Sequence, residues 1–158
     1  VRRFFEILRR VDVVFKEFRG RFMGKSSPVH FFWGSFDLAV TRFSGRAAPP
    51  RPDADPIARQ AYNQEVISLG FWPGGSGVDG AAFYSYTAPA PPGLAAAPVR
   101  PEGAFYHPKL GEFLLMYDDV RSAARPEERI LEFAESTYEA GARLAGWDRA
   151  ALEMAASP

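Results

Sequence analysis

The chain has 158 residues, the size of a single domain, with 47% apolar and 24% charged side chains. This composition is typical of a globular protein and excludes an intrinsically disordered chain. The 19 basic and 19 acidic side chains cancel, and the absence of cysteine excludes disulfides, thiolate metal sites and cysteine nucleophiles. No apolar run approaches the roughly 20 residues of a membrane-spanning helix, and no secretory leader is recognisable. We therefore expect a cytoplasmic protein with no membrane partner.

The N-terminal segment 2–22 has the spacing of an amphipathic helix. Apolar side chains recur every three or four residues, and basic side chains occupy much of the remainder. The apolar stripe contains Phe4, Leu8, Val11, Phe15, Phe18 and Phe22. We expect this stripe to pack on a sheet. The alternative is a non-catalytic protein-interaction module, in which the basic amphipathic helix binds a partner.

Residues 29–43 are rich in β-branched and aromatic side chains and predict one strand. Its alternation gives one purely apolar face, made of Phe32, Phe36, Leu38 and Val40. The other face is mixed and carries Trp33, Ser35, Asp37, Ala39 and Thr41. Asp37 is notable because a carboxylate in a buried strand must be paired, hydrogen-bonded or functional. It is a candidate general base or ligand-orienting group. The alternative is a structural role, either an ion pair, with Arg42 or Arg121 as possible partners, or a hydrogen-bonded aspartate.

The remaining elements follow in chain order. The proline-rich segment 45–59 predicts a loop, and residues 57–64 a short helix. Strands are predicted at 65–72 and 81–87, then one or two strands at 104–107 and 111–117 after a second proline-rich loop at 88–103. A helix is predicted from about Pro126 to Ala145, with Pro126 at its first position. Because no crossover helices separate the strands, we expect an α+β fold. It has a mainly antiparallel sheet of four to five strands, flanked by an N-terminal and a C-terminal helix, in a single domain 1–158.

Several familiar chemistries find no support. Gly75–Gly80 matches the letters of a dinucleotide-binding loop, but a strand follows it where that motif requires a helix. The two histidines, His30 and His107, have no local metal-ligand spacing, so we expect no metal and no cofactor. No serine lies in a nucleophile elbow. The segment 26–111 is electrically balanced, which argues against a nucleic-acid partner.

Aromatic side chains from four predicted strands are the best indication of a site. Trp33, Trp72, Tyr84, Tyr86 and Tyr117 converge on a sheet if the fold is correct, and they would then line an apolar pocket for a small molecule. The alternative is an ordinary aromatic core. The candidate ligand-binding residues are His30, Trp33, Ser35, Asp37, Arg42, Glu65, Trp72, Tyr84 and Tyr86. The function predicted is therefore small-molecule binding, with enzymatic activity left open.

Two long segments carry a family resemblance. Ser27–Arg46 and Glu65–Gly75, supported by Leu110–Arg121 and Ser136–Ala140, resemble an uncharacterised bacterial family catalogued as a domain of unknown function. The resemblance implies that this chain matches the C-terminal half of a longer protein. The missing N-terminal half or a second copy of the chain would then be its packing partner. Two positions depart from the family pattern: Gln64 stands where a histidine is expected, and Met116 where a proline is expected.

Overall fold

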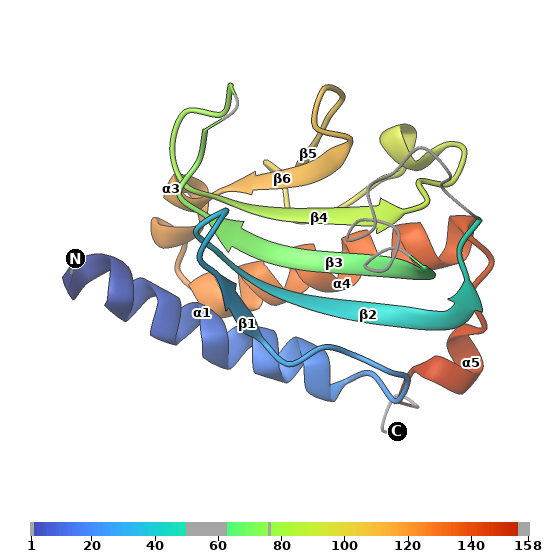
Figure 1. Ribbon diagram of the computed structural model, residues 1–158. Coiled ribbons are helices and arrows are strands. Elements are labelled where there is room, and N and C mark those ends of the chain that lie inside the picture. Colours follow the sequence, from blue (N-terminus) through green and yellow to red (C-terminus); the bar gives the residue numbers. More distant parts are fainter. Residues whose placement is uncertain (1, 50–62, 76, 155–158) are drawn as a thin grey trace.

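The computed structural model describes residues 2–49, 63–75 and 77–154, and it has an α+β fold (Figure 1). The helices are α1 (Arg2–Gly20), α3 (Tyr117–Arg121), α4 (Pro126–Leu144) and α5 (Arg149–Leu152), with a short 3₁₀ helix η1 (Leu94–Ala96). The strands are β1 (His30–Phe32), β2 (Asp37–Ala47), β3 (Gln64–Trp72), β4 (Ala82–Ala88), β5 (Phe105–His107) and β6 (Glu112–Met116). Within the described ranges, no helix is long and apolar enough to cross a membrane.

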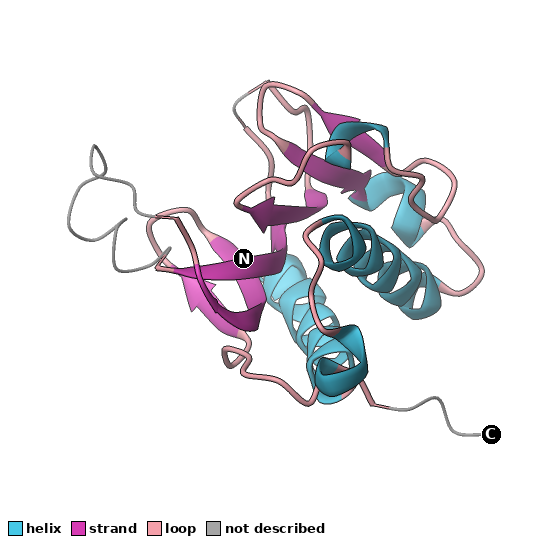
Figure 2. Cartoon of the chain, turned by 90° about the vertical axis from the view of Figure 1, so that its right-hand side faces the viewer, coloured by secondary structure: helices cyan, strands magenta, loops and turns pink. Residues whose placement is uncertain are grey.

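All six strands form one antiparallel sheet in the order β1-β2-β3-β4-β6-β5. The predicted fold class is therefore confirmed, with one or two strands more than expected. The two long helices α1 and α4 cover one face of the sheet, and Figure 2 shows them on the same side. The pocket described below opens on the opposite face, which we call the open face.

The core lies between the helices and the sheet. Alternate residues of β2 and β3 enter it, including Val40, Ile67 and Phe71, and the α1 stripe meets them. Phe15 and Phe18 of that stripe are almost completely buried. Burial of this stripe explains why the N-terminal segment is a stable helix.

Helix α4 approaches the sheet closely because Gly141 has no side chain. A Cβ at this position would lie 2.2 Å from the Thr87 side-chain oxygen on β4 and 3.0 Å from the Ile67 side chain on β3. Gly141 thus sets the distance between helix and sheet.

The structure corrects the prediction of a single strand over residues 29–43. The segment is a hairpin, in which β1 and β2 pair from His30 opposite Ala39 to Phe32 opposite Asp37. The connecting turn closes with a hydrogen bond of 2.7 Å from the Phe36 amide to the Phe32 carbonyl, and Phe36 has a left-handed φ of 58°. The period-two alternation runs without interruption through this turn, so it concealed the reversal of the chain.

Three smaller differences concern the ends of the predicted elements. Strand β2 extends to Ala47, into the segment predicted as a loop, because its pairing with β3 resumes there opposite Gln64 after an irregularity. Tyr117 begins α3 instead of ending a strand. The predicted short helix at 57–64 lies mostly outside the described residues, and its last residue, Gln64, begins β3.

Candidate functional site

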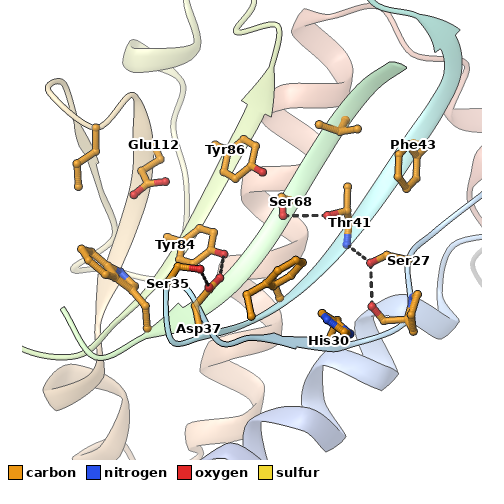
Figure 3. Close-up of a pocket in the computed structure, with 16 residues that line it drawn as sticks. Ser27, His30, Ser35, Asp37, Thr41, Phe43, Ser68, Tyr84, Tyr86 and Glu112 are labelled. Atoms are coloured by element: carbon orange, nitrogen blue, oxygen red, sulfur yellow. Dashed lines mark hydrogen bonds between the residues drawn. The ribbon is translucent and has the colours of Figure 1, made fainter. Parts of the chain in front are cut away.

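A pocket of about 660 Å³ opens on the open face of the sheet (Figure 3). This volume lies within the range of small-molecule sites. Its lining residues come from β1, β2, β3, β4 and β6 and from the segments beside them: Ser27, Pro28, His30, Phe32, Ser35, Asp37, Ala39, Thr41, Phe43, Val66, Ser68, Trp72, Tyr84, Tyr86, Leu110 and Glu112. The strand alternation explains this set, because the same strands send their other residues into the core.

Asp37 is the most constrained polar group of the pocket. Its side chain is only 6% exposed. One carboxylate oxygen accepts a hydrogen bond from the Ser35 hydroxyl, and the other accepts one from the Tyr84 hydroxyl. Figure 3 shows the three side chains converging from the hairpin and from β4. The two donors satisfy the buried carboxylate and hold it in one orientation.

Tyr84 reaches Asp37 by crossing β3, and Gly70 makes this crossing possible. Gly70 is paired with Tyr84 in the sheet, and a Cβ at Gly70 would lie 2.1 Å from the Tyr84 ring. Burial, followed by the hydrogen bond to Asp37, raises the pKa of Tyr84 well above its ordinary value. The phenol therefore stays protonated near neutral pH and acts as a donor.

Glu112 contributes a second carboxyl group from β6. Burial, together with the negative charge of Asp37, raises the pKa of Glu112 to about 7. A carboxyl group with this pKa changes its charge near neutral pH, which is a property of many functional sites. It therefore adds a titratable group to a pocket whose other carboxylate is held by two donors.

Hydroxyl groups and aromatic rings complete the lining. The Thr41 and Ser68 hydroxyls lie 3.0 Å apart on neighbouring strands, and the Ser27 hydroxyl accepts a hydrogen bond of 2.9 Å from the Thr41 amide. The Tyr84 and Tyr86 rings are stacked, with centroids 6.2 Å apart and an interplanar angle of 9°. The pocket thus combines apolar ring surface with a small number of oriented polar groups.

Six of the predicted ligand-binding residues line this pocket: His30, Ser35, Asp37, Trp72, Tyr84 and Tyr86. Trp33 does not line it, because it lies in the β1–β2 turn and is 81% exposed. The predicted strand had placed Trp33 on the same face as Asp37, whereas in the turn the Trp33 ring lies 5.2 Å from the Phe31 ring and 6.4 Å from the Phe36 ring, between centroids.

Arg42 and Glu65 also lie elsewhere, on the helix-covered face. Arg42 follows Thr41, so the strand alternation turns its side chain away from the pocket. The Arg42 guanidinium is 1% exposed and lies 3.5 Å from the centre of the Phe18 ring, and it donates to Glu135 at 3.3 Å. Glu65 pairs with Arg46 at 2.7 Å. Arg42 therefore does not form the ion pair with Asp37 that was one alternative; the Asp37 carboxylate is instead hydrogen-bonded, which was the other structural alternative.

The alternation of side chains along the strands also places in the pocket three residues that the sequence analysis left outside the candidate set. Thr41, Ser68 and Glu112 face the pocket together with Asp37 and Tyr84. Thr41 was visible on the mixed face of its strand, and Glu112 has the alternation of a residue facing away from buried Phe113. Their meeting depends on the strand order, which places β6 next to β4 and which the sequence pattern does not reveal.

Within residues 2–49, 63–75 and 77–154, no three histidine or acidic side chains lie close enough together to hold a metal ion. The donors that do converge on the pocket are two carboxyl groups, hydroxyls and one histidine at its edge.

The comparisons with known proteins identify a family. No curated protein and no solved structure matches the chain significantly. The family model described as "Family of unknown function (DUF5996)" matches residues 1–154, which is almost the whole chain. The chain therefore belongs to the DUF5996 family, a family of unknown function.

Proposed function

We propose that the protein binds a small organic molecule in the pocket on the open face of the sheet. The observation that carries this proposal is the arrangement around Asp37. A buried carboxylate is fixed by Ser35 and Tyr84 at the wall of a pocket of about 660 Å³. Pockets of this size that combine ring surface with a few fixed polar groups are typical of ligand sites.

The alternative, a protein-interaction module based on α1, is less well supported. It requires an exposed apolar stripe on this helix, whereas Val11, Val14, Phe15 and Phe18 are buried against the sheet and α4. Among the described side chains of α1, the large apolar ones that are exposed are Phe5 and Val13. Two separate side chains do not form the continuous docking face that a helix partner needs.

A fragment screen tests the proposed function. Ligand-observed NMR is carried out on the native protein and on Thr41→Trp, which places a large side chain at the centre of the pocket floor. Ala47→Trp is the matched control, because Ala47 is exposed on the same strand and does not line the pocket. We expect fragments that bind the native protein and the control but not Thr41→Trp. If no fragment distinguishes the folded Thr41→Trp variant from the control, the proposal is wrong.

The broader setting belongs to the same proposal. We expect a bacterial, cytoplasmic protein in which residues 1–158 form one domain, corresponding to the C-terminal half of a longer protein. A preceding half or a second copy of the chain would then pack against it. Size-exclusion chromatography with light scattering, on this chain and on the product of the whole gene, checks the packing partner.

A further inference from the structure

The formally charged side chains that line the pocket are acidic. Among its sixteen lining residues, the acidic side chains are Asp37 and Glu112, and no lysine or arginine is present. His30 is exposed at the edge of the pocket. A ligand that enters this pocket therefore meets a negative potential in a partly desolvated cavity, where charge interactions are stronger than in water.

The two carboxyl groups lie toward the same end of the pocket. In Figure 3, Glu112, Tyr84 and Asp37 lie on one side of the close-up, and Phe43 lies on the opposite side. The positive charges recorded near the pocket residues do not offset the acidic end. The Lys25 ammonium lies 4.7 Å from the centre of the Phe43 ring, at the other end, and Arg42 lies beneath the sheet against α1 and α4.

The raised pKa of Glu112 also agrees with a positively charged ligand. Its pKa of about 7 arises from burial and from repulsion by Asp37. Asp37 has two hydrogen-bond donors, whereas the described hydrogen bonds and ion pairs include none to the Glu112 side chain. A positive group beside Glu112 would offset the repulsion by Asp37 and compensate the desolvation of the Glu112 carboxylate.

The aromatic walls suit a cation as well. The electron-rich faces of Tyr and Trp rings attract ammonium groups within about 6 Å of their centres. Tyr84 and Tyr86 present parallel rings beside the carboxyl groups, and Trp72 lines the same cavity. Carboxylates and aromatic ring faces both attract organic ammonium ions, and this pocket contains both.

We infer that the ligand of this pocket is an organic cation, an amine or quaternary ammonium group on an apolar body, with its charged end beside Glu112, at the end of the pocket that also holds Asp37. The apolar body lies along Tyr86 and Thr41 toward Phe43. This inference rests on the proposed function, because it names the ligand class of the same pocket. It disfavours phosphorylated and carboxylated ligands, whose charge would face two carboxylates and no lysine or arginine among the described lining residues.

Three probes of similar size and different charge test the inference: benzyltrimethylammonium, benzyl alcohol and benzoate. Their dissociation constants are measured by NMR titration at pH 8, where Glu112 is ionised. We expect the cation to bind at least about tenfold more tightly than the alcohol, and benzoate to bind least. Glu112→Gln should weaken the cation about tenfold and leave the alcohol within twofold, and Asp37→Asn should act in the same direction. Glu6→Gln, the same change at an exposed position of α1, is the control and should leave all three constants unchanged.

The outcomes separate the inference from the proposed function. If Thr41→Trp blocks the binding of benzyl alcohol, benzoate or library fragments, but the cation binds the native protein no more tightly than the alcohol, the pocket binds ligands and the cation inference is overturned. It is also overturned if the cation binds equally well to Glu112→Gln and Asp37→Asn. If Thr41→Trp affects no probe and no fragment, the proposed function itself fails.

Discussion

Replacing Gly70 by alanine tests how the pocket is built. The new Cβ would lie 2.1 Å from the Tyr84 ring, so the ring must move and the hydrogen bond from Tyr84 to Asp37 must break. A hydrogen bond to a charged group contributes about 1.5–3 kcal/mol. Alanine in a strand regains about 0.5–1 kcal/mol relative to glycine. We therefore expect Gly70→Ala to lower the free energy of unfolding by about 1–2 kcal/mol.

A double-mutant cycle shows whether the destabilisation by Gly70→Ala depends on the Tyr84 ring. In a Tyr84→Ala background the ring is gone, so Gly70→Ala should stabilise the protein by about 0.5–1 kcal/mol, which reverses its sign. Urea denaturation of the native protein, the two single variants and the double variant gives the coupling. Gly34→Ala is the control, because a Cβ at Gly34 in the β1–β2 turn has no atom within 4 Å. Equal destabilisation by Gly70→Ala in both backgrounds would refute the role assigned to Gly70.

Three further substitutions have expected effects on stability. For Glu112 the pKa is higher in the folded state than in the unfolded state, so its contribution to stability falls as the pH rises from about 4.5 to about 7. Urea titrations at several pH values should show that Glu112→Gln stabilises by about 1–2 kcal/mol at pH 8 and by almost nothing near pH 4.5; a constant gain would contradict this. Arg42→Met leaves Glu135 without its buried partner and should destabilise by about 3 kcal/mol, while fragment binding, measured by NMR, stays unchanged because Arg42 lies on the other face. Thermal unfolding should show that Gly141→Ala destabilises by about 1–3 kcal/mol, since its Cβ would collide with β4, whereas Gly20→Ala, with no atom within 4 Å, should not destabilise; equal effects would disprove the close packing.

The elements with strong periodicity were predictable from sequence. The stripe of α1 and the proline at the start of α4 define both helices to within about two residues, and the alternation around Asp37 assigned Asp37 to the open face and Val40 to the core. These predictions succeed because the burial of one face determines the period of apolar residues.

The rest depended on long-range contacts. The reversal at residues 33–36 is invisible to a period of two, and it leaves Trp33 exposed in the turn, outside the pocket lining. Arg42 carries the sequence signature of a surface or site residue, yet the ring of Phe18 and the carboxylate of Glu135 allow its burial. The approach of Glu112 to Asp37 requires the strand order β4-β6, which no local pattern encodes.

Chemical-shift mapping of the isotope-labelled protein with benzyltrimethylammonium at pH 8 tests the central claim most directly. If the pocket binds an organic cation, saturable amide shifts should cluster on the open-face strands around Asp37, Ser68, Tyr84 and Glu112. They should also shrink strongly in Glu112→Gln. Saturable shifts centred instead on α1 or α4, or no saturable shifts at all, would contradict the account.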